Sequence, residues 1–246
     1  MQKGVLFEWG AGDLTLTATD CSRIARATVP ATAGMGSVGA EAAPGQRMVM
    51  PIEAVDELVR ILNDVPDGAA VRLSPTEGDR HGLLVALGDV TLFSRPIEGE
   101  FPQIERIIPQ AWRTRVTVET EAFRQAARTA SLDGRLHPLL LDAAPMRLRL
   151  YARGQGDGGA ETRVAAAVEG DAQRVVLSAE LLLPILAAAA SPRLELSWTE
   201  PLRPLLIREA GQKSDEAGDT PHTAPRAATW VVQPMDAPGV AAHVFA

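Results

Sequence analysis

The sequence has little of three things: cysteine, long apolar runs and positive charge. A single Cys, Cys21, stands among the 246 residues, which excludes a disulfide framework within the chain and fits a reducing compartment. The longest apolar run, Leu181–Ala190, is about half the length of a membrane span and contains a proline. The N-terminus lacks the apolar segment of a signal peptide. From these absences we expect a cytoplasmic protein.

Positive charge is in deficit, because 24 Lys and Arg face 31 Asp and Glu and the formal net charge is −7. Any nucleic-acid contact would therefore need a local basic patch. The sequence also has no Walker loop, dinucleotide fingerprint, His-Glu metal motif or paired Cys cluster. We accordingly expect neither a cofactor nor a metal ion.

An internal repeat is the most informative feature that the sequence does contain. Strand-like alternation at Leu14–Ala18 (LTLTA) returns at Leu148–Ala152 (LRLYA). Three further pairs follow in the same order: Arg23–Val29 with Arg163–Val168, Arg47–Leu62 with Arg174–Leu186, and Val71–Glu77 with Leu194–Glu200; Thr91–Ile97 with Thr229–Met235 completes the series. A period of about 130 residues is a domain and not a solenoid repeat. The sequence predicts an α+β protein of two repeated domains, residues 1–112 and 113–246.

The two copies differ at their starts. In the second copy, a strand at Arg115–Val118 and a helix beginning near Thr120 precede the strand Leu139–Asp142. In the first copy, the counterpart of the strand Leu139–Asp142 is Val5–Glu8, which begins within a few residues of Met1. We therefore expect the first domain to be shortened at its N-terminus, lacking its first strand and helix unless a partner chain supplies them.

The helices carry predictions of their own. The stretch Ile52–Asp64 places apolar side chains on one stripe, as an amphipathic helix does. That stripe consists of Ile52, Val55, Val59 and Leu62. Thr120 is the expected N-cap of the next helix, and Ser178 that of the third.

Three stretches together resemble the bacterial beta sliding clamp, the beta subunit of DNA polymerase III. They are GVLFEWGAGDLTLTATDCSRIA from Gly4, EGEFPQIERIIP from Glu98 and WVVQPM from Trp230. The similarity follows the family's order up to Met235 and corresponds to the second and third of its three domains. The family's fold is a ring of repeated α+β domains, with helices that line a hole for duplex DNA. The resemblance implies a non-enzymatic processivity factor that self-associates into a homodimer ring if the missing N-terminal part is present.

The resemblance also implies a binding site. In the family, a hydrophobic groove between the second and third domains receives short peptides from DNA polymerase, the clamp loader and repair proteins. An apolar slot of this kind anchors bulky side chains, while arginines orient the peptide. Carried over by position, the groove comprises Thr19, Cys21, Ser22, Arg23, Ile24, Pro102, Arg106, Ile107, Leu136, Pro204, Val231, Val232, Gln233, Pro234 and Met235.

The expected DNA-facing helices carry little positive charge. Ile52–Asp64 has one arginine against four carboxylates, Glu119–Arg135 is balanced, and Ser178–Ala190 adds only a glutamate. Arg124 and Arg128 are the best candidates for phosphate contacts. We expect weak attraction to double-stranded DNA, without sequence specificity.

Other interpretations stay open for the same residues. Asp20 and Arg23 are also typical of a turn whose carboxylate caps backbone N–H groups. A Cys-dependent hydrolase would need a base near Cys21, and none of the four His lies near it in sequence. Ser22 lacks the glycine-flanked nucleophile elbow. A truncated or diverged clamp-like module, which binds peptides without encircling DNA, is the alternative within the same fold.

Overall fold

The computed structural model describes residues 4–31, 43–66, 68–76, 81–131, 138–153, 158–210 and 227–237. The chain divides into two compact units. Among the described residues, unit 1 holds those up to Asp20 and from Arg26 to Pro102, and unit 2 holds Cys21–Ala25 and those from Gln103 onward. The predicted boundary between residues 112 and 113 stays a prediction.

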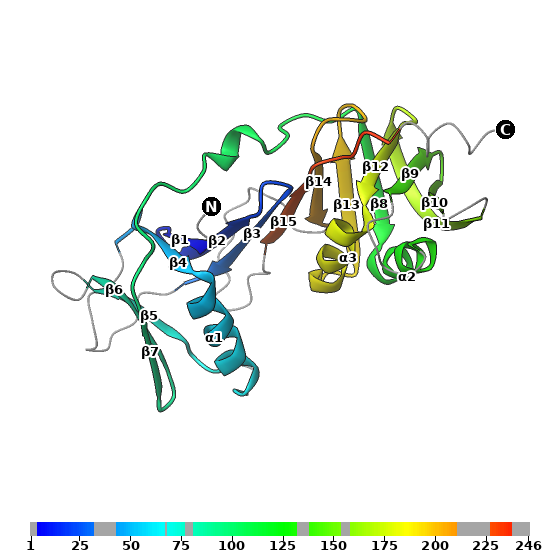
Figure 1. Cartoon of the computed structure of the whole chain (residues 1–246). Helices are drawn as coiled ribbons and strands as arrows, with labels where there is room; N and C mark the ends of the chain where they lie inside the picture. Colours follow the sequence, from blue (N-terminus) through cyan, green and yellow to red (C-terminus); the bar gives the residue numbers. More distant parts are fainter. Residues whose placement is uncertain are drawn as a thin grey trace. The chain divides into compact units, whose positions relative to one another are not determined.

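Unit 1 contains two antiparallel sheets and, in its described part, one α-helix (Figure 1). The strand orders are β3-β2-β1-β4 and β5-β6-β7, and β3 begins in the segment assigned to unit 2. The elements are β1 (Gly4–Trp9), β2 (Asp13–Thr19), β3 (Arg23–Pro30), β4 (Arg47–Pro51), α1 (Ile52–Asn63), β5 (Arg72–Thr76), β6 (Gly82–Leu87) and β7 (Val90–Ser94).

Unit 2 contains an antiparallel sheet of order β12-β9-β10-β11-β8-β13-β14-β15, with two helices that pack side by side on one face (Figure 1). The elements are η2 (Ile104–Arg106), β8 (Thr114–Glu119), α2 (Thr120–Ala130), β9 (Pro138–Ala144), β10 (Arg147–Arg153), β11 (Gly159–Gly170), β12 (Arg174–Ser178), α3 (Ala179–Ala188), β13 (Arg193–Trp198), β14 (Leu205–Glu209) and β15 (Ala227–Val232). No helix in the described ranges is long and apolar enough to cross a membrane.

The predicted repeat is confirmed by the order of the elements. The series β1-β2-β3-β4-α1-β5-β6-β7 has the same succession of strands and helix as β9-β10-β11-β12-α3-β13-β14-β15. In unit 2, β8 pairs with both β11 and β13 and so joins the two halves into one sheet. The described part of unit 1 has no counterpart of β8, and its β5-β6-β7 strands form a separate sheet.

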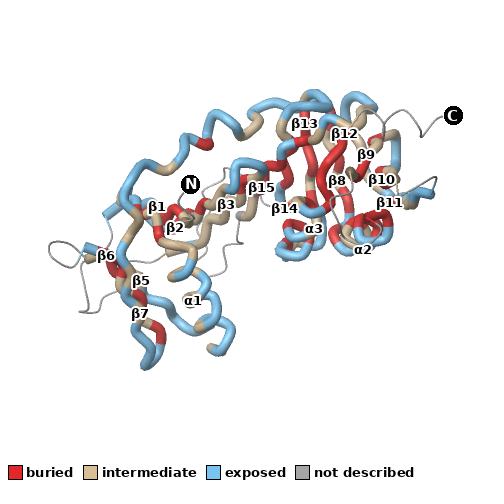
Figure 2. Tube along the Cα trace, viewed as in Figure 1, coloured by how far each residue is buried: buried red, intermediate tan, exposed pale blue. Residues whose placement is uncertain are grey.

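The core of unit 2 lies between its sheet and its helices. Leu139 and Leu141 of β9 point to the helices, where Phe123 of α2 and Leu186 of α3 are also fully buried. Ala127 is fully buried as well, and its small side chain lets the two helices approach closely. Figure 2 shows this buried interior running along the strands of unit 2.

Helix α1 forms where the sequence predicts it, but only part of the predicted stripe is covered. Val55 packs against the core of unit 1 together with Leu58. Val59, by contrast, is 49% exposed, and Leu62 is exposed too. In unit 2, α3 is flanked by α2, whereas no second helix lies against α1 in the part of unit 1 that is described. The apolar periodicity thus predicted the helix but not which elements pack against it.

Candidate functional site

The turn between β2 and β3 holds the cluster of polar residues that the sequence singled out. Cys21 has a φ of 72°, in the left-handed region that non-glycine residues seldom adopt, and its side chain is exposed. The next residue, Ser22, accepts a hydrogen bond through its carbonyl oxygen from the Gln233 N–H at 2.9 Å. A tight turn therefore presents these residues beside Gln233, the residue that follows β15.

The chain beyond β15 is the second part of the candidate site. Val231 and Val232 are buried in β15, opposite Leu206 and Leu205 of β14. Past the exposed Gln233, the Met235 N–H donates a hydrogen bond of 2.8 Å to the Val176 carbonyl oxygen on β12. The segment from Gln233 to Met235 therefore lies between the Ser22 turn and β12, within unit 2.

Met235 packs on the sheet face opposite the helices. Because side chains alternate along a strand, Leu140 points away from the face that carries Leu139 and Leu141. Leu140 and Val176 form a small cluster there, against which Tyr151 and Met235 pack. The side chain of Met235 stays partly exposed at the edge of this apolar surface.

The segment around Ile107 supplies an exposed apolar side chain. Ile104, in the short helix η2, is buried, and its carbonyl oxygen accepts the Ile107 N–H at 2.9 Å. Ile107 itself is 48% exposed, and Arg106 is exposed beside it. Burial of Ile104 thus fixes a turn that offers Ile107 to solvent, which suits a binding residue better than a core residue.

The other predicted groove residues are distributed as follows. Ile24 is buried at the start of β3, and Pro204 is partly buried just before β14. Thr19 and Pro102 belong to unit 1, whereas the remaining described groove residues belong to unit 2. Leu136 lies outside the described residues. The contacts above bring the Ser22 turn and the Met235 segment together, and the complete groove stays a prediction.

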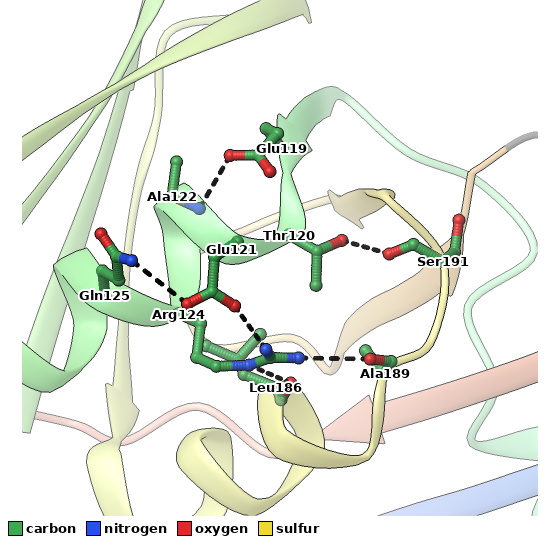
Figure 3. A network of polar contacts seen from close by, with 9 residues as sticks. All are labelled: Glu119, Thr120, Glu121, Ala122, Arg124, Gln125, Leu186, Ala189 and Ser191. Atoms are coloured by element: carbon green, nitrogen blue, oxygen red, sulfur yellow. Dashed lines mark hydrogen bonds and ion pairs between the residues drawn. The ribbon is translucent and has the colours of Figure 1, made fainter.

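Arg124, one of the two predicted DNA contacts, is engaged inside unit 2 (Figure 3). Its Nε donates to the Leu186 carbonyl oxygen at 2.9 Å and its Nη2 to that of Ala189 at 3.2 Å, while Nη1 pairs with Glu121 at 2.5 Å. The last carbonyls of a helix lack partners within the helix, so the guanidinium closes the end of α3. Arg128 is exposed and remains the better candidate for a phosphate contact.

The start of α2 corrects the predicted cap. The N-cap is Glu119 and not Thr120: its carboxylate accepts the Ala122 N–H at 2.9 Å. Thr120 is the first helical residue, and its hydroxyl donates to the Ser191 carbonyl oxygen at 2.6 Å (Figure 3). The reason is tertiary, because the loop after α3 lies within reach of the threonine. Ser178 does flank α3 as predicted, but its side chain makes no capping hydrogen bond.

Sequence reasoning missed Glu209, which holds the same loop from the other side. This buried carboxylate accepts the N–H groups of Ala190 and Ser191 at 2.7 and 2.9 Å. The sequence pattern that could have identified Glu209 is its place in β14, two residues beyond Ile207 on the inward-facing side of the strand. A charged residue at such a position requires partners.

We expect Arg124→Ala to lower the free energy of unfolding by about 2 kcal/mol, because two charge-assisted hydrogen bonds to helix-end carbonyls are lost. Urea denaturation followed by circular dichroism measures this change. The matched control is Arg128→Ala, one turn further on the exposed side of α2, for which a change within about 0.5 kcal/mol is expected. Equal effects of the two substitutions would contradict the structural role of Arg124.

Helix α1 offers no free arginine to a phosphate either. Arg60 pairs with Glu57 at 2.5 Å and with Asp64 at 3.8 Å; Arg60 and Asp64 are exposed and Glu57 is partly exposed. The hydrogen bond from Arg60 lowers the pKa of the Glu57 carboxyl, with the positive charge of Arg60 acting in the same direction.

Within the described ranges, no group of three or more His, Cys, Asp or Glu is placed to hold a metal ion.

Sequence comparisons find similarity to beta sliding clamps. Residues 105–219 match the model of the DNA polymerase III beta subunit, C-terminal domain. The beta sliding clamp of Pseudomonas putida is 26% identical over 210 residues, covering 85% of this chain and 54% of the relative. The beta sliding clamp of Bacillus subtilis is 29% identical over 166 residues, which cover 65% of this chain and 43% of that relative. The chain spans about half the length of the curated relatives it matches.

Solved structures show the same fold. A DNA polymerase sliding clamp from Bacillus subtilis superposes with a TM-score of 0.77 at 24% identity, covering 96% of this chain and 57% of that one. A sliding clamp from Pseudomonas aeruginosa, solved bound to griselimycin, gives the same TM-score and coverage at 20% identity. The predicted fold class, repeated sliding-clamp domains of α+β type, is confirmed.

Proposed function

We propose that this DNA polymerase III beta subunit-like chain, which has the sliding-clamp fold, acts as a DNA polymerase processivity factor. It is not an enzyme in this proposal: it tethers DNA polymerase, the clamp loader and repair proteins to double-stranded DNA. Tethering raises the effective concentration of a polymerase at its template, so each contact can be of modest affinity. The place of action is the cytoplasm, where self-association completes a ring around DNA if the N-terminal part of the family's chain is present.

The observation that carries the proposal is the extent of the likeness. It covers 96% of this chain at a TM-score of 0.77, and the sequence relatives that match it bear the name beta sliding clamp. The turn at Cys21 agrees with a docking surface better than with a hydrolase, since it is a tight turn that meets the segment after β15 through the Ser22–Gln233 hydrogen bond.

The docking site in this proposal is the predicted groove, with Ile107 and Met235 as its apolar anchors. Ile107 is exposed from a turn fixed by Ile104, and Met235 lies at the edge of the Leu140–Val176 cluster. An apolar side chain that is partly exposed loses water when a peptide covers it, which favours binding. The flexible thioether of Met235 suits a site that accepts different partners.

Titration with griselimycin tests the proposal, since a similar clamp was solved with this molecule bound. We expect saturable binding of one griselimycin per chain, measured by isothermal titration calorimetry. The absence of any binding heat or saturation, with the chain shown to be folded by circular dichroism, would contradict the docking function.

One observation favours the second candidate, a clamp-like module that binds peptides without encircling DNA. Arg60 of α1 and Arg124 of α2 are engaged by carboxylates or carbonyls, so among the arginines of these two helices Arg128 is left to attract phosphates. Gel filtration with plasmid DNA separates the two candidates. A processivity factor stays on closed circular duplex and leaves it after linearisation. The clamp-like module, by contrast, binds griselimycin but stays on neither the circular nor the linear plasmid.

A further inference from the structure

An arginine-lined hollow of about 680 Å³ opens on unit 2, and none of its lining residues is a predicted groove residue. Its wall comes from the β9–β10 hairpin, the start of β12, the β13–β14 loop and the residue before β8. Ligand sites in proteins typically measure about 300–1,000 Å³, so the hollow is large enough for a short segment of a partner. Its charged lining residues are Arg113, Asp142, Arg147, Arg149, Arg174 and Glu200.

The base of the hollow is a fixed array of charges. Asp142 accepts a hydrogen bond from Arg149 at 2.8 Å and one from Arg174 at 3.2 Å. All three side chains stand on the sheet face opposite the helices, because Arg149 and Arg174 lie directly across from Asp142 on the strands either side of β9. Arg149 also pairs with Glu161 at 3.6 Å, so two carboxylates balance the two guanidinium groups at the base. The positive charge of the lining therefore comes from Arg113 and Arg147.

The rim is formed by Arg113 and Arg147, both exposed. Neither forms an ion pair with another described residue. The backbone at Arg113 is fixed by a hydrogen bond from its N–H to Trp198 and another from Asp171 to its carbonyl oxygen, both of 2.9 Å. Gly170, at a φ of 79°, permits this contact, because a Cβ there would stand 1.9 Å from the Arg113 carbonyl oxygen.

The hollow also offers hydrogen-bond acceptors. The amide of Gln173 is oriented by a hydrogen bond from its Nε2 to the Thr199 carbonyl oxygen at 3.3 Å. Its Oε1 is buried and has no hydrogen-bond partner among the described residues. The carboxylates of Asp142 and Glu200 add further acceptors to the lining. A ligand that fits this wall therefore presents donors as well as negative charge.

Apolar side chains adjoin the lining residues. Met146 is 85% exposed at the tip of the β9–β10 hairpin, between Pro145 and Arg147, and its φ of 63° is unusual for a residue with a side chain. Leu202 is exposed next to Pro201, which lines the hollow. Methionine and arginine together at an exposed site are typical of protein interfaces.

We infer that this hollow binds an acidic peptide segment of a partner protein, a second docking site beyond the predicted groove. Asp or Glu side chains of the segment pair with Arg113 and Arg147, while its backbone N–H groups donate to Gln173 Oε1 and Asp142. An apolar residue of the segment packs on Met146. A nucleic-acid backbone fits less well, because phosphodiesters carry no donors and are repelled by Asp142 and Glu200.

The probe for this site is a fluorescein-labelled peptide of three Asp-Leu-Glu repeats, titrated with the full chain and followed by fluorescence anisotropy. We expect the double variant Arg113→Gln, Arg147→Gln to bind at least tenfold more weakly. The matched control, Arg128→Gln with Arg163→Gln, removes the same charge from two exposed positions of unit 2 outside the hollow. It is expected to change the affinity less than twofold.

Four other outcomes would overturn the inference. Equal weakening by the two double variants would mean attraction by net charge alone, and the unaltered chain failing to bind the peptide would mean no site. Displacement of the peptide by excess griselimycin would place it in the predicted groove. Tighter binding of a ten-nucleotide oligo-dT through the same two arginines would make the hollow a nucleic-acid site. Failure of griselimycin itself to bind would affect only the proposed function.

Discussion

Met235→Asp is expected to weaken griselimycin binding by at least about 100-fold, as measured by isothermal titration calorimetry. Met235 packs against the apolar cluster of Leu140 and Val176. In the proposed groove, a bound ligand would cover its exposed part. A carboxylate at this place would have to give up water against an apolar surface without a partner, which costs several kcal/mol. Each factor of ten in affinity corresponds to about 1.4 kcal/mol.

The matched control is Met146→Asp, which makes the same chemical change at a methionine that is 85% exposed on the β9–β10 hairpin. We expect it to leave griselimycin affinity within about twofold, because the new carboxylate stays in water. Met235→Ala is expected to have an intermediate effect. It should weaken griselimycin binding about tenfold, because apolar contact is lost but no charge is introduced.

Loss of the fold is distinguished from loss of the site by the backbone contacts. The Met235 N–H bonds to the Val176 carbonyl oxygen whatever the side chain, and the cluster beneath it does not belong to the main core. The melting temperature of Met235→Asp should therefore stay close to that of the unaltered chain. A folded Met235→Asp variant with undiminished affinity would refute the assignment of Met235 to the groove.

Leu141→Ala is expected to lower the free energy of unfolding of unit 2 by about 3–4 kcal/mol. Leu141 is 0% exposed, in the middle of β9, and belongs to the cluster that joins the sheet to α2 and α3. Removing its branched end leaves a cavity that a close-packed interior fills only in part, so lost burial and lost contacts add together. Urea denaturation monitored by circular dichroism gives the value.

Leu202→Ala is the control, since it deletes the same atoms from a leucine that is 55% exposed in the β13–β14 loop of the same unit. We expect a change of less than about 0.5 kcal/mol. Similar values for both leucines would mean that β9 does not lie at the centre of the core.

The alternation along β9 separates stability from docking. Leu141 points to the helices and holds unit 2 together, whereas Leu140, its neighbour, points to the opposite face and supports Met235. Asp142, on the same face as Leu140, anchors the arginines of the hollow. Substitutions of exposed or partly exposed residues on the outward face, such as Met235, are therefore expected to alter the proposed binding with little effect on the fold.

Helices and strands could be predicted from the sequence because the patterns that indicate them extend over only a few residues. Period-two alternation located β2 and β10, and the apolar stripe at Ile52–Asp64 located α1. The repeat then implied two similar domains. The stripe could not tell that Val59 would be exposed, because exposure depends on which elements pack nearby.

The candidate site was accessible only in part. The resemblance assigned Ser22 and Gln233 to one groove, and the structure joins them by a hydrogen bond, although more than 200 residues separate them in the chain. Spacing alone gives no means of pairing such distant segments. The arginine hollow carried no sequence signal at all, since its residues come from four separate stretches.

The sequence by itself determined the strands, the helices and their repetition, because backbone propensity and side-chain periodicity act over a few residues. Only the tertiary structure decided the partners of individual side chains. Arg124 closes the end of α3, Glu119 takes the capping position predicted for Thr120, and Glu209 holds the loop that follows α3. Such partners depend on which distant segments meet, and that is settled by packing a whole unit at once.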